Sequence, residues 1–232
     1  MLSRKGGSGK TTLAVHLSVL GQLAGRRTLL VDLDPQRSAA DWWRAREAEA
    51  PQLVETDPTG LRDVLAAARA DGVDLVVIDT RPSAEADAAL VASLSDLILI
   101  PTQPAIFDLR AILGTIDTVK GAIRRSVIVL NRCQPPRGAG EATETGDARR
   151  AVAAFGVPVA SVAIVDRMTF RRAPLAGLTA VEAEPDGKAA NEMHALWRVA
   201  EKELSHEKAH AGKRAGEAGD GASAATRVAG AR

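Results

Sequence analysis

Lys5-Gly6-Gly7-Ser8-Gly9-Lys10-Thr11-Thr12 has the small residues, the lysine and the hydroxyl side chains of a phosphate-binding loop. A glycine-rich loop that leads into a helix turns backbone N–H groups towards a phosphate, and the helix N-terminus favours negative charge. By the roles that this motif assigns, Lys10 contacts the β- and γ-phosphates and Thr11 binds Mg²⁺. We expect Thr12 to contact the α-phosphate. The stretch predicts a site for ATP and Mg²⁺ formed by Gly6, Gly7, Ser8, Gly9, Lys10, Thr11 and Thr12.

The loop departs from the general pattern G-x-x-x-x-G-K-[ST], which would have a glycine at the position of Arg4. The arrangement K-G-G-x-G-K-T-T resembles the deviant Walker A loop of the ParA/MinD family of ATPases. This resemblance implies that Lys5 reaches across a nucleotide-sandwich homodimer to the partner's phosphates. Lys5 and Lys10 are therefore candidate catalytic residues. A chance turn rich in glycine and lysine is the alternative, and the motifs further along the chain argue against it.

Charge and cysteine content exclude several classes of protein. The 30 basic and 29 acidic residues give a net charge of +1, so binding to DNA or anionic lipid would need a local patch. The single cysteine, Cys133, excludes an internal disulfide. No apolar run approaches the roughly 18 residues of a membrane-spanning helix, and nothing resembles a signal peptide. We expect a cytoplasmic protein.

Continuous apolar runs rich in valine and isoleucine alternate with segments of helical length. Such runs are typical of strands buried on both faces, and the alternation predicts an α/β fold with a doubly wound, mostly parallel sheet flanked by helices. The predicted strands are 28–33, 75–78, 97–100, 127–130 and 159–164. The predicted helices are 11–24, 36–49, 59–71, 83–94, 108–124, 143–156 and 188–204.

The two ends of the chain differ from this pattern. Only Met1 to Arg4 precede the phosphate-binding loop, although such a loop normally follows an apolar strand. We therefore expect the first strand to be missing and the start of the chain to be truncated or misassigned. Residues 205–232 are almost entirely alanine, glycine and charged residues, which predicts a disordered basic tail. The expected organisation is a nucleotide-binding domain over 1–204 followed by a tail over 205–232.

Three further motifs follow predicted strands, at the edge where open α/β sheets bind ligands. Asp34, in Asp32-Leu33-Asp34-Pro35-Gln36, resembles the family's D-x-D-P-Q aspartate that positions and activates the attacking water. Asp34 also suits a helix N-cap followed by Pro35. Asp79, at the end of an apolar strand, has the form of a Walker B aspartate and would hold Mg²⁺ through water. Asn131 follows another strand where many relatives read the adenine edge, and a turn-forming asparagine is the alternative.

Two neighbouring segments add detail to the resemblance. Arg81 departs from the family's usual D-T-P-P sequence and would contact phosphate, a partner or solvent. The segment from Leu99 to Pro104, followed by Asp108-Leu109-Arg110, resembles the strand end that shapes the dimer-facing switch region. Together with a C-terminal segment at 165–181, the resemblance covers residues 4 to 204.

The choice of family member depends on the remaining segments. A lone cysteine cannot supply the two ligands per subunit of the nitrogenase iron protein. The tail lacks the large apolar residues of an amphipathic membrane helix, which argues against membrane targeting. ParA proteins bind DNA nonspecifically through basic residues in the C-terminal part of the fold, and Arg167, Arg171 and Arg172 are the candidates. A solvated charged surface is the alternative.

These observations favour an ATPase that acts as a dimerising switch, is associated with the nucleoid and segregates plasmid or chromosomal DNA. The resemblance implies a small centromere-binding or adaptor protein as the partner that stimulates hydrolysis. Positioning of another cargo, or promotion of conjugative DNA transfer, is the first alternative. A nucleotide-binding regulatory module without hydrolysis is the second.

Overall fold

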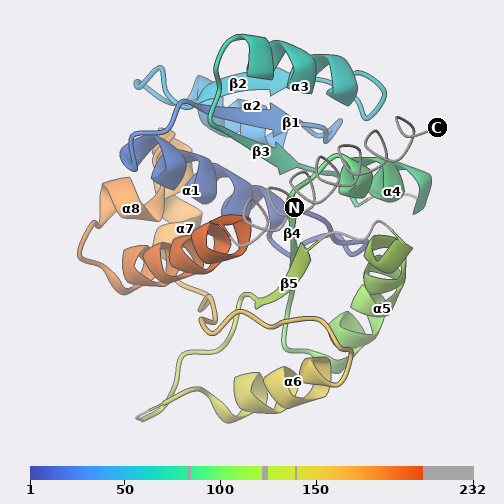
Figure 1. Ribbon diagram of the computed structural model, residues 1–232. Helices are drawn as coiled ribbons and strands as arrows, with labels where there is room; N and C mark the ends of the chain where they lie inside the picture. Colours follow the sequence, from blue (N-terminus) through green and yellow to red (C-terminus); the bar gives the residue numbers. More distant parts are fainter. Residues whose placement is uncertain (83–84, 122–124, 139, 206–232) are drawn as a thin grey trace, which may run out of the picture.

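The computed structural model describes residues 1–82, 85–121, 125–138 and 140–205 (Figure 1). Helices and strands alternate along most of the described chain. The strands are β1 (Thr28–Asp32), β2 (Gln52–Glu55), β3 (Leu75–Asp79), β4 (Leu97–Thr102) and β5 (Arg125–Leu130). The longer helices are α1 (Lys10–Leu23), α2 (Ser38–Arg44), α3 (Leu61–Ala70), α4 (Glu85–Ser93), α5 (Ile106–Gly121) and α6 (Thr143–Ala153). The short helices α7 (Thr169–Arg172), η1 (Ala173–Ala176) and α8 (Ala180–Ala183) lead to a final helix over 188–205.

All strand pairs are parallel, in the order β2-β1-β3 and, separately, β4-β5. The segment Met1–Ser3 lies between the two groups. The Met1 nitrogen donates to the Ile78 carbonyl on β3 at 2.7 Å, and the Leu2 N–H donates to the Leu99 carbonyl on β4 at 3.0 Å. The prediction of a doubly wound parallel sheet is confirmed. Residues 1–4 form no strand, but Leu2 is buried in the core where a strand residue would lie.

Alternate residues of the strands face two different layers of helices, as the pleat requires. On β4 and β5, Ile100 and Ile128 point into a core shared with helices α3 to α6. Their neighbours Leu99 and Val129 point to the opposite core, formed with α1 and the helix over 188–205. The sheet is therefore buried on both faces (Figure 1).

One expectation about strands was wrong, and one strand was missed. Residues 159–164 do not form a continuous strand, because the chain bends at residues 161 and 162. Val159 makes an isolated bridge to Ile128, and Val165, just after this run, makes another to Cys133. The edge strand β2 was not predicted. The residues of the predicted tail lie outside the described part of the chain, apart from Ser205, which is helical.

Candidate nucleotide-binding site

The phosphate-binding loop ends at Gly9, where helix α1 begins. Gly9 and Gly7 have positive φ angles of 93° and 74°, which residues with a Cβ adopt rarely. No side chain caps α1, and among the described residues no carbonyl accepts from the backbone N–H groups of Gly9 to Thr12. These N–H groups and the positive end of the helix dipole are available to an anion, as the motif predicts.

Lys10 and Asp79 lie beside the start of α1. Both side chains are buried, and the Lys10 ammonium contacts the Lys5 carbonyl at 3.4 Å. Burial lowers the pKa of Lys10, while the negative charges of Asp79 and Asp34 act in the opposite direction. Burial raises the pKa of Asp79 to about 6, while Thr11 and Lys10 oppose this shift. The two predicted residues are thus brought together at the expected end of the sheet.

The buried carboxylate of Asp79 fits the predicted Mg²⁺ site. The Thr11 hydroxyl lies near enough to lower its pKa, but neither oxygen forms a hydrogen bond of good geometry with a described residue, and such a group is costly to leave unsatisfied. No cluster of three His, Cys, Asp or Glu side chains that could hold a metal occurs in the described ranges. Mg²⁺ does not need one, because it keeps several waters and binds through one or two protein oxygens plus phosphates. Asp79 and Thr11 are the residues that could hold it.

The end of β1 and the loop after it carry two aspartates, Asp32 and Asp34, which differ in burial and in hydrogen bonding. Asp32 is buried and accepts from the N–H groups of Asp34 at 2.9 Å and Ala40 at 3.1 Å. Asp34 is half-buried and accepts from the Gln36 N–H at 2.9 Å. Asp32 therefore fixes the loop, and Asp34 is the carboxylate left closer to solvent. Asp34 is not a helix cap, because Arg37, with a left-handed φ of 54°, precedes α2.

Asn131 packs directly on the phosphate-binding loop. Its amide nitrogen donates to the Ser8 carbonyl at 2.7 Å, and a Cβ on Gly9 would come within 2.0 Å of that nitrogen. Gly9 is therefore required both for its φ angle and for this close approach. Contact of Asn131 with adenine stays a prediction, because the observed partner of its amide is the loop backbone.

Two further contacts to the loop were not predicted. Gln103 Nε2 and Arg132 Nη1 both donate to the Gly7 carbonyl, at 3.1 and 3.3 Å. Both residues follow strands that end beside the loop, β4 and β5. Their position after a strand was the available signal, since these strand ends meet at one edge of the sheet.

Lys5 pairs with Asp108, which lies in the first turn of α5. The Lys5 ammonium is 2.5 Å from Asp108 Oδ2, and the lysine side chain is 40% exposed. Lys5 is thus accessible at the surface of the subunit. Its role towards a partner's phosphates stays a prediction.

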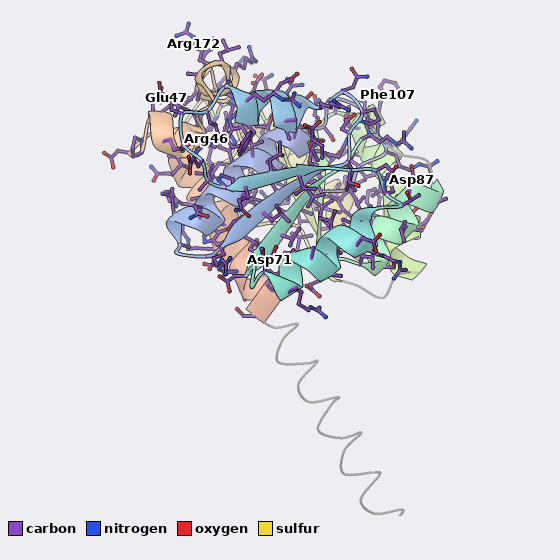
Figure 2. The ribbon with its side chains drawn as sticks, turned by 90° about the horizontal axis from the view of Figure 1, so that it is seen from above. Arg46, Glu47, Asp71, Asp87, Phe107 and Arg172 are labelled. Carbon is purple, nitrogen blue, oxygen red and sulfur yellow. The ribbon has the colours of Figure 1, made fainter. Side chains whose placement is uncertain are left out.

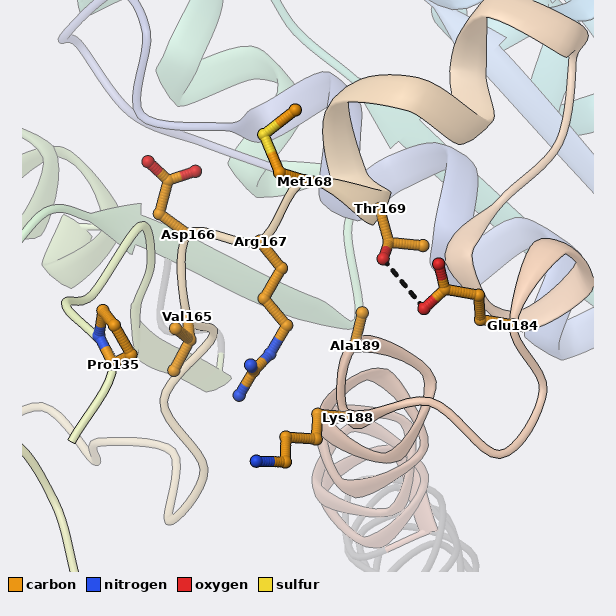
Figure 3. Close-up of a pocket in the computed structure, with 9 residues that line it drawn as sticks. All are labelled: Pro135, Val165, Asp166, Arg167, Met168, Thr169, Glu184, Lys188 and Ala189. Atoms are coloured by element: carbon orange, nitrogen blue, oxygen red, sulfur yellow. Dashed lines mark hydrogen bonds between the residues drawn. The ribbon is translucent and has the colours of Figure 1, made fainter. Parts of the chain in front are cut away.

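The three arginines predicted to bind DNA have different surroundings. Arg167 is paired with Glu192 at 2.5 Å, and Arg171 is paired with Asp166. Arg172 is exposed, and no side chain among the described residues pairs with it. A cavity of about 350 Å³ is lined by Arg167, Lys188 and Thr169, among others, and Thr169 donates to Glu184 at 3.0 Å (Figure 3). Of the three arginines, Arg167 lines this cavity, whereas Arg171 and Arg172 do not.

Helix α2 is fixed to the segment that carries these arginines. Arg46, whose side chain is only 3% exposed, contacts Glu182 at 2.7 Å and the Gly177 carbonyl at 2.7 Å. Its guanidinium also lies 4.6 Å from the centre of the Trp42 ring. Arg46 and Arg172 lie on the same side of the molecule (Figure 2). This connection between the loop of Asp34 and the C-terminal segment was not predicted.

His16 forms a second connection to that segment. Its Nδ1 lies 2.7 Å from the Thr12 carbonyl, and its Nε2 accepts from the Ala180 N–H at 2.9 Å. The carbonyl can only accept, so the neutral ring must carry its proton on Nδ1. Burial lowers the pKa of His16 to about 4, which agrees with a neutral ring.

None of the helices in the described ranges combines the length and the apolar character needed to cross a membrane.

Comparison with known proteins identifies the family. Residues 1–180 match the CobQ/CobB/MinD/ParA nucleotide binding domain. The maintenance of carboxysome distribution protein A of Gloeobacter kilaueensis is 35% identical over 208 residues, covering 89% of this chain and 93% of that protein. The chromosome-partitioning ATPase Soj of Thermus thermophilus is 32% identical over 115 residues, covering 36% of this chain and 45% of that protein.

A solved structure shares the fold. The septum site-determining protein MinD of Pyrococcus horikoshii, complexed with Mg-ADP, has a TM-score of 0.70 and 20% identity, covering 89% of this chain and 96% of that chain. The family match covers most of the chain. It agrees with the geometry of the site, in which a phosphate-binding loop lies beside a buried aspartate. The chain belongs to the CobQ/CobB/MinD/ParA family of nucleotide-binding domains and is a P-loop ATPase of the ParA/MinD type.

Proposed function

We propose that the protein is an ATP-hydrolysing switch that distributes a cargo inside the cell, and that this cargo is a carboxysome. The observation that supports nucleotide chemistry best is the buried, unpaired carboxylate of Asp79 beside Lys10 and the uncapped start of α1. Together these groups suit a Mg²⁺-bound triphosphate.

The residues of the site would have distinct roles in hydrolysis. Lys10 and the N–H groups of the loop would hold the phosphates, and Asp34 would orient the attacking water. Bound Mg²⁺ would neutralise charge on the phosphate oxygens. Phosphoryl transfer depends on positioning and charge stabilisation, so a half-buried carboxylate near the site is suitable without being a strong base.

The switch would depend on dimerisation. In the ATP state, Lys5 would leave Asp108 and reach the phosphates of a second subunit in a homodimer. That dimer would bind nonspecific DNA through Arg167, Arg171 and Arg172, which would place the protein on the nucleoid. A small adaptor protein on the cargo would stimulate hydrolysis and return the subunits to the monomeric state.

The cargo is proposed from the comparisons. Similarity to the carboxysome distribution protein extends over 89% of this chain, whereas similarity to Soj extends over 36%. Distribution of a carboxysome is therefore the first candidate, and partition of plasmid or chromosomal DNA is the second.

Two measurements test the proposal. ATP turnover should be slow for the protein alone and should rise when DNA and the adaptor protein are added; no turnover in any combination would favour a regulatory module. Deletion of the gene in its native host should cluster labelled carboxysome shells. Normal shell spacing together with loss of a labelled plasmid or chromosomal locus would support DNA partition instead.

A further inference from the structure

Arg81 lies in the loop after β3, close to the phosphate-binding loop. It follows Asp79 by two positions, and the next residue, Pro82, packs near Gly6: a Cβ on Gly6 would lie 3.7 Å from Pro82 Cγ. The fold therefore holds the backbone of Arg81 beside the residues that are proposed to bind phosphate.

Arg81 also shares a cavity with Asp34. The cavity has a volume of about 310 Å³, and the ends of β1, β2 and β3 surround it. Asp32, Asp34 and Arg81 line it, together with Leu33, Pro35, Arg37, Glu55, Thr56, Asp57 and Pro58. The hydrogen bond from Arg81 to Asp87 raises the pKa of the arginine, and the charge of Asp34 acts in the same direction.

The present partner of Arg81 holds it weakly. Arg81 Nη2 is 2.5 Å from Asp87 Oδ2 on α4, and the two side chains are 42% and 28% exposed. Ion pairs this exposed contribute little to stability. Asp87 lies at the edge of the molecule (Figure 2). Because the pair is weak, Arg81 can replace its contact with Asp87 by a contact with a phosphate oxygen at little cost in free energy. The other arginine of the cavity, Arg37, is paired with Glu55 at 3.2 Å.

We propose that Arg81 is a catalytic residue of ATP hydrolysis, which leaves Asp87 and contacts the γ-phosphoryl group in the transition state of its own subunit. This inference rests on the proposed ATPase function. The water oxygen forms the new bond to phosphorus, and the bond to the bridging oxygen breaks with its electron pair leaving on ADP. Both protons of the water end on the released phosphate, which leaves as H2PO4−, while ADP departs without taking a proton. Arg81 exchanges no proton; it stabilises the charge on the equatorial oxygens.

The test compares the purified full chain with Arg81→Ala, Arg81→Lys and Asp87→Asn. Arg81→Ala should lower kcat by about 100-fold, as loss of one transition-state contact does, while the Kd for ATP changes less than about threefold. Arg81→Lys should recover only part of the rate lost in Arg81→Ala, because lysine lacks the planar guanidinium group that can donate two parallel hydrogen bonds to a phosphate. Asp87→Asn should keep or raise kcat, because it releases the arginine.

A second readout separates catalysis from a structural role. The wild-type protein should bind ADP with aluminium fluoride, which imitates the transition state, and Arg81→Ala should lose this binding while it keeps that of ADP alone. Arg150→Ala is the control, since Arg150 forms a surface ion pair with Asp147 on α6, more exposed than the pair of Arg81 with Asp87, and it should change neither quantity.

The outcomes distinguish the two proposals. Wild-type turnover with an unchanged kcat in Arg81→Ala would overturn the role of Arg81 and leave the ATPase function intact. Loss of ADP binding or a lowered Tm in Arg81→Ala would assign the residue to structure and also overturn the inference. Absence of turnover in the wild type would overturn both.

Discussion

The ammonium group of Lys5 and the carboxylate of Asp108 lie 2.5 Å apart, so the extra lysine of the phosphate-binding loop is neutralised within its own subunit. Asp108 is buried, and its second oxygen has no partner among the described residues. A sandwich dimer would have to break this pair before Lys5 could reach a second nucleotide. In the proposed dimer, the pair would therefore oppose dimerisation until ATP offered Lys5 a better partner.

Substitution of the two loop lysines should separate nucleotide binding from dimerisation. Lys10→Ala should abolish ATP binding, because it removes the buried ammonium beside Asp79. Lys5→Ala should bind ATP as a monomer and fail to dimerise. Asp108→Asn should lower the dimer dissociation constant about fivefold, the equivalent of about 1 kcal/mol for an ion pair whose lysine is partly exposed to solvent. A nucleotide-binding assay distinguishes Lys10→Ala from Lys5→Ala, and sedimentation with and without ATP measures the dimerisation of each variant. Undiminished dimerisation of Lys5→Ala would contradict the sandwich.

Asp34→Ala should retain ATP binding and dimerisation but lose hydrolysis, because it removes only the carboxylate proposed to orient water. Asp32→Ala is the comparison. Since Asp32 accepts hydrogen bonds from two backbone N–H groups, one of them buried, its loss should lower the free energy of unfolding by about 1–3 kcal/mol. Turnover assays and thermal unfolding distinguish the two variants. Full turnover of Asp34→Ala would remove the residue from the mechanism.

His16 should make folding stability fall in acid. Its pKa is lowered from 6.5 to about 4, so below pH 6.5 the unfolded chain binds more protons than the folded chain. The stability advantage of wild type over His16→Gln, which cannot titrate, should therefore shrink by about 3 kcal/mol between pH 7 and pH 4. Urea unfolding at several pH values measures this change. A difference that is constant with pH would show that His16 does not titrate as inferred.

Gly177→Ala should disrupt the contact between α2 and the C-terminal segment. The new Cβ would lie 2.4 Å from the backbone of Ala45 and Arg46, at a φ angle of 64°. Both the clash and the strained φ predict a loss of about 2 kcal/mol or more in the free energy of unfolding. Gly146→Ala, inside α6 with only Arg150 Nη1 nearby at 3.7 Å, is the control and should be neutral or stabilising. Equal stability of the two variants would contradict this view of Gly177.

The proposed DNA contact predicts a specific salt dependence. With the Asp34→Ala dimer bound to ATP, Arg172→Ala should weaken DNA binding at low salt. The slope of log K against log salt concentration should fall by about 0.9 for each phosphate contact removed. Arg171→Ala should have a smaller effect, because Arg171 is already paired with Asp166. An unchanged slope in Arg172→Ala would show that Arg172 does not contact DNA phosphates and that the DNA-binding surface lies elsewhere.

The sequence predicted those parts of the fold that depend on local pattern. Strands such as Val127–Leu130 are continuous apolar runs because both of their faces are buried, and they were recognised for that reason. β2 was missed because it is a short edge strand whose end residues, Gln52 and Glu55, are exposed. The run at 159–164 is apolar enough for a strand, but its bend prevents a continuous ladder, and a pattern of residue types does not encode that bend.

The sequence predicted those parts of the site in which a known motif determines which residues lie close together. Lys10, Thr11 and Asp79 are brought together as expected from a loop and strand end of this kind. The pairs of Lys5 with Asp108 and of Arg46 with Glu182 join residues that are distant in the sequence. Such pairs depend on the packing of whole helices, so the sequence pattern contains no local signal for them.

The environment of Cys133 has a practical consequence. This single thiol is buried, and burial raises its pKa to about 11, so at neutral pH it is protonated and shielded from reagents. The wild-type chain is therefore already a suitable background for site-specific labelling. In Phe107→Cys, which alters an exposed residue next to Asp108, a fluorophore would follow the opening of the Lys5 pair in real time without prior removal of a native thiol.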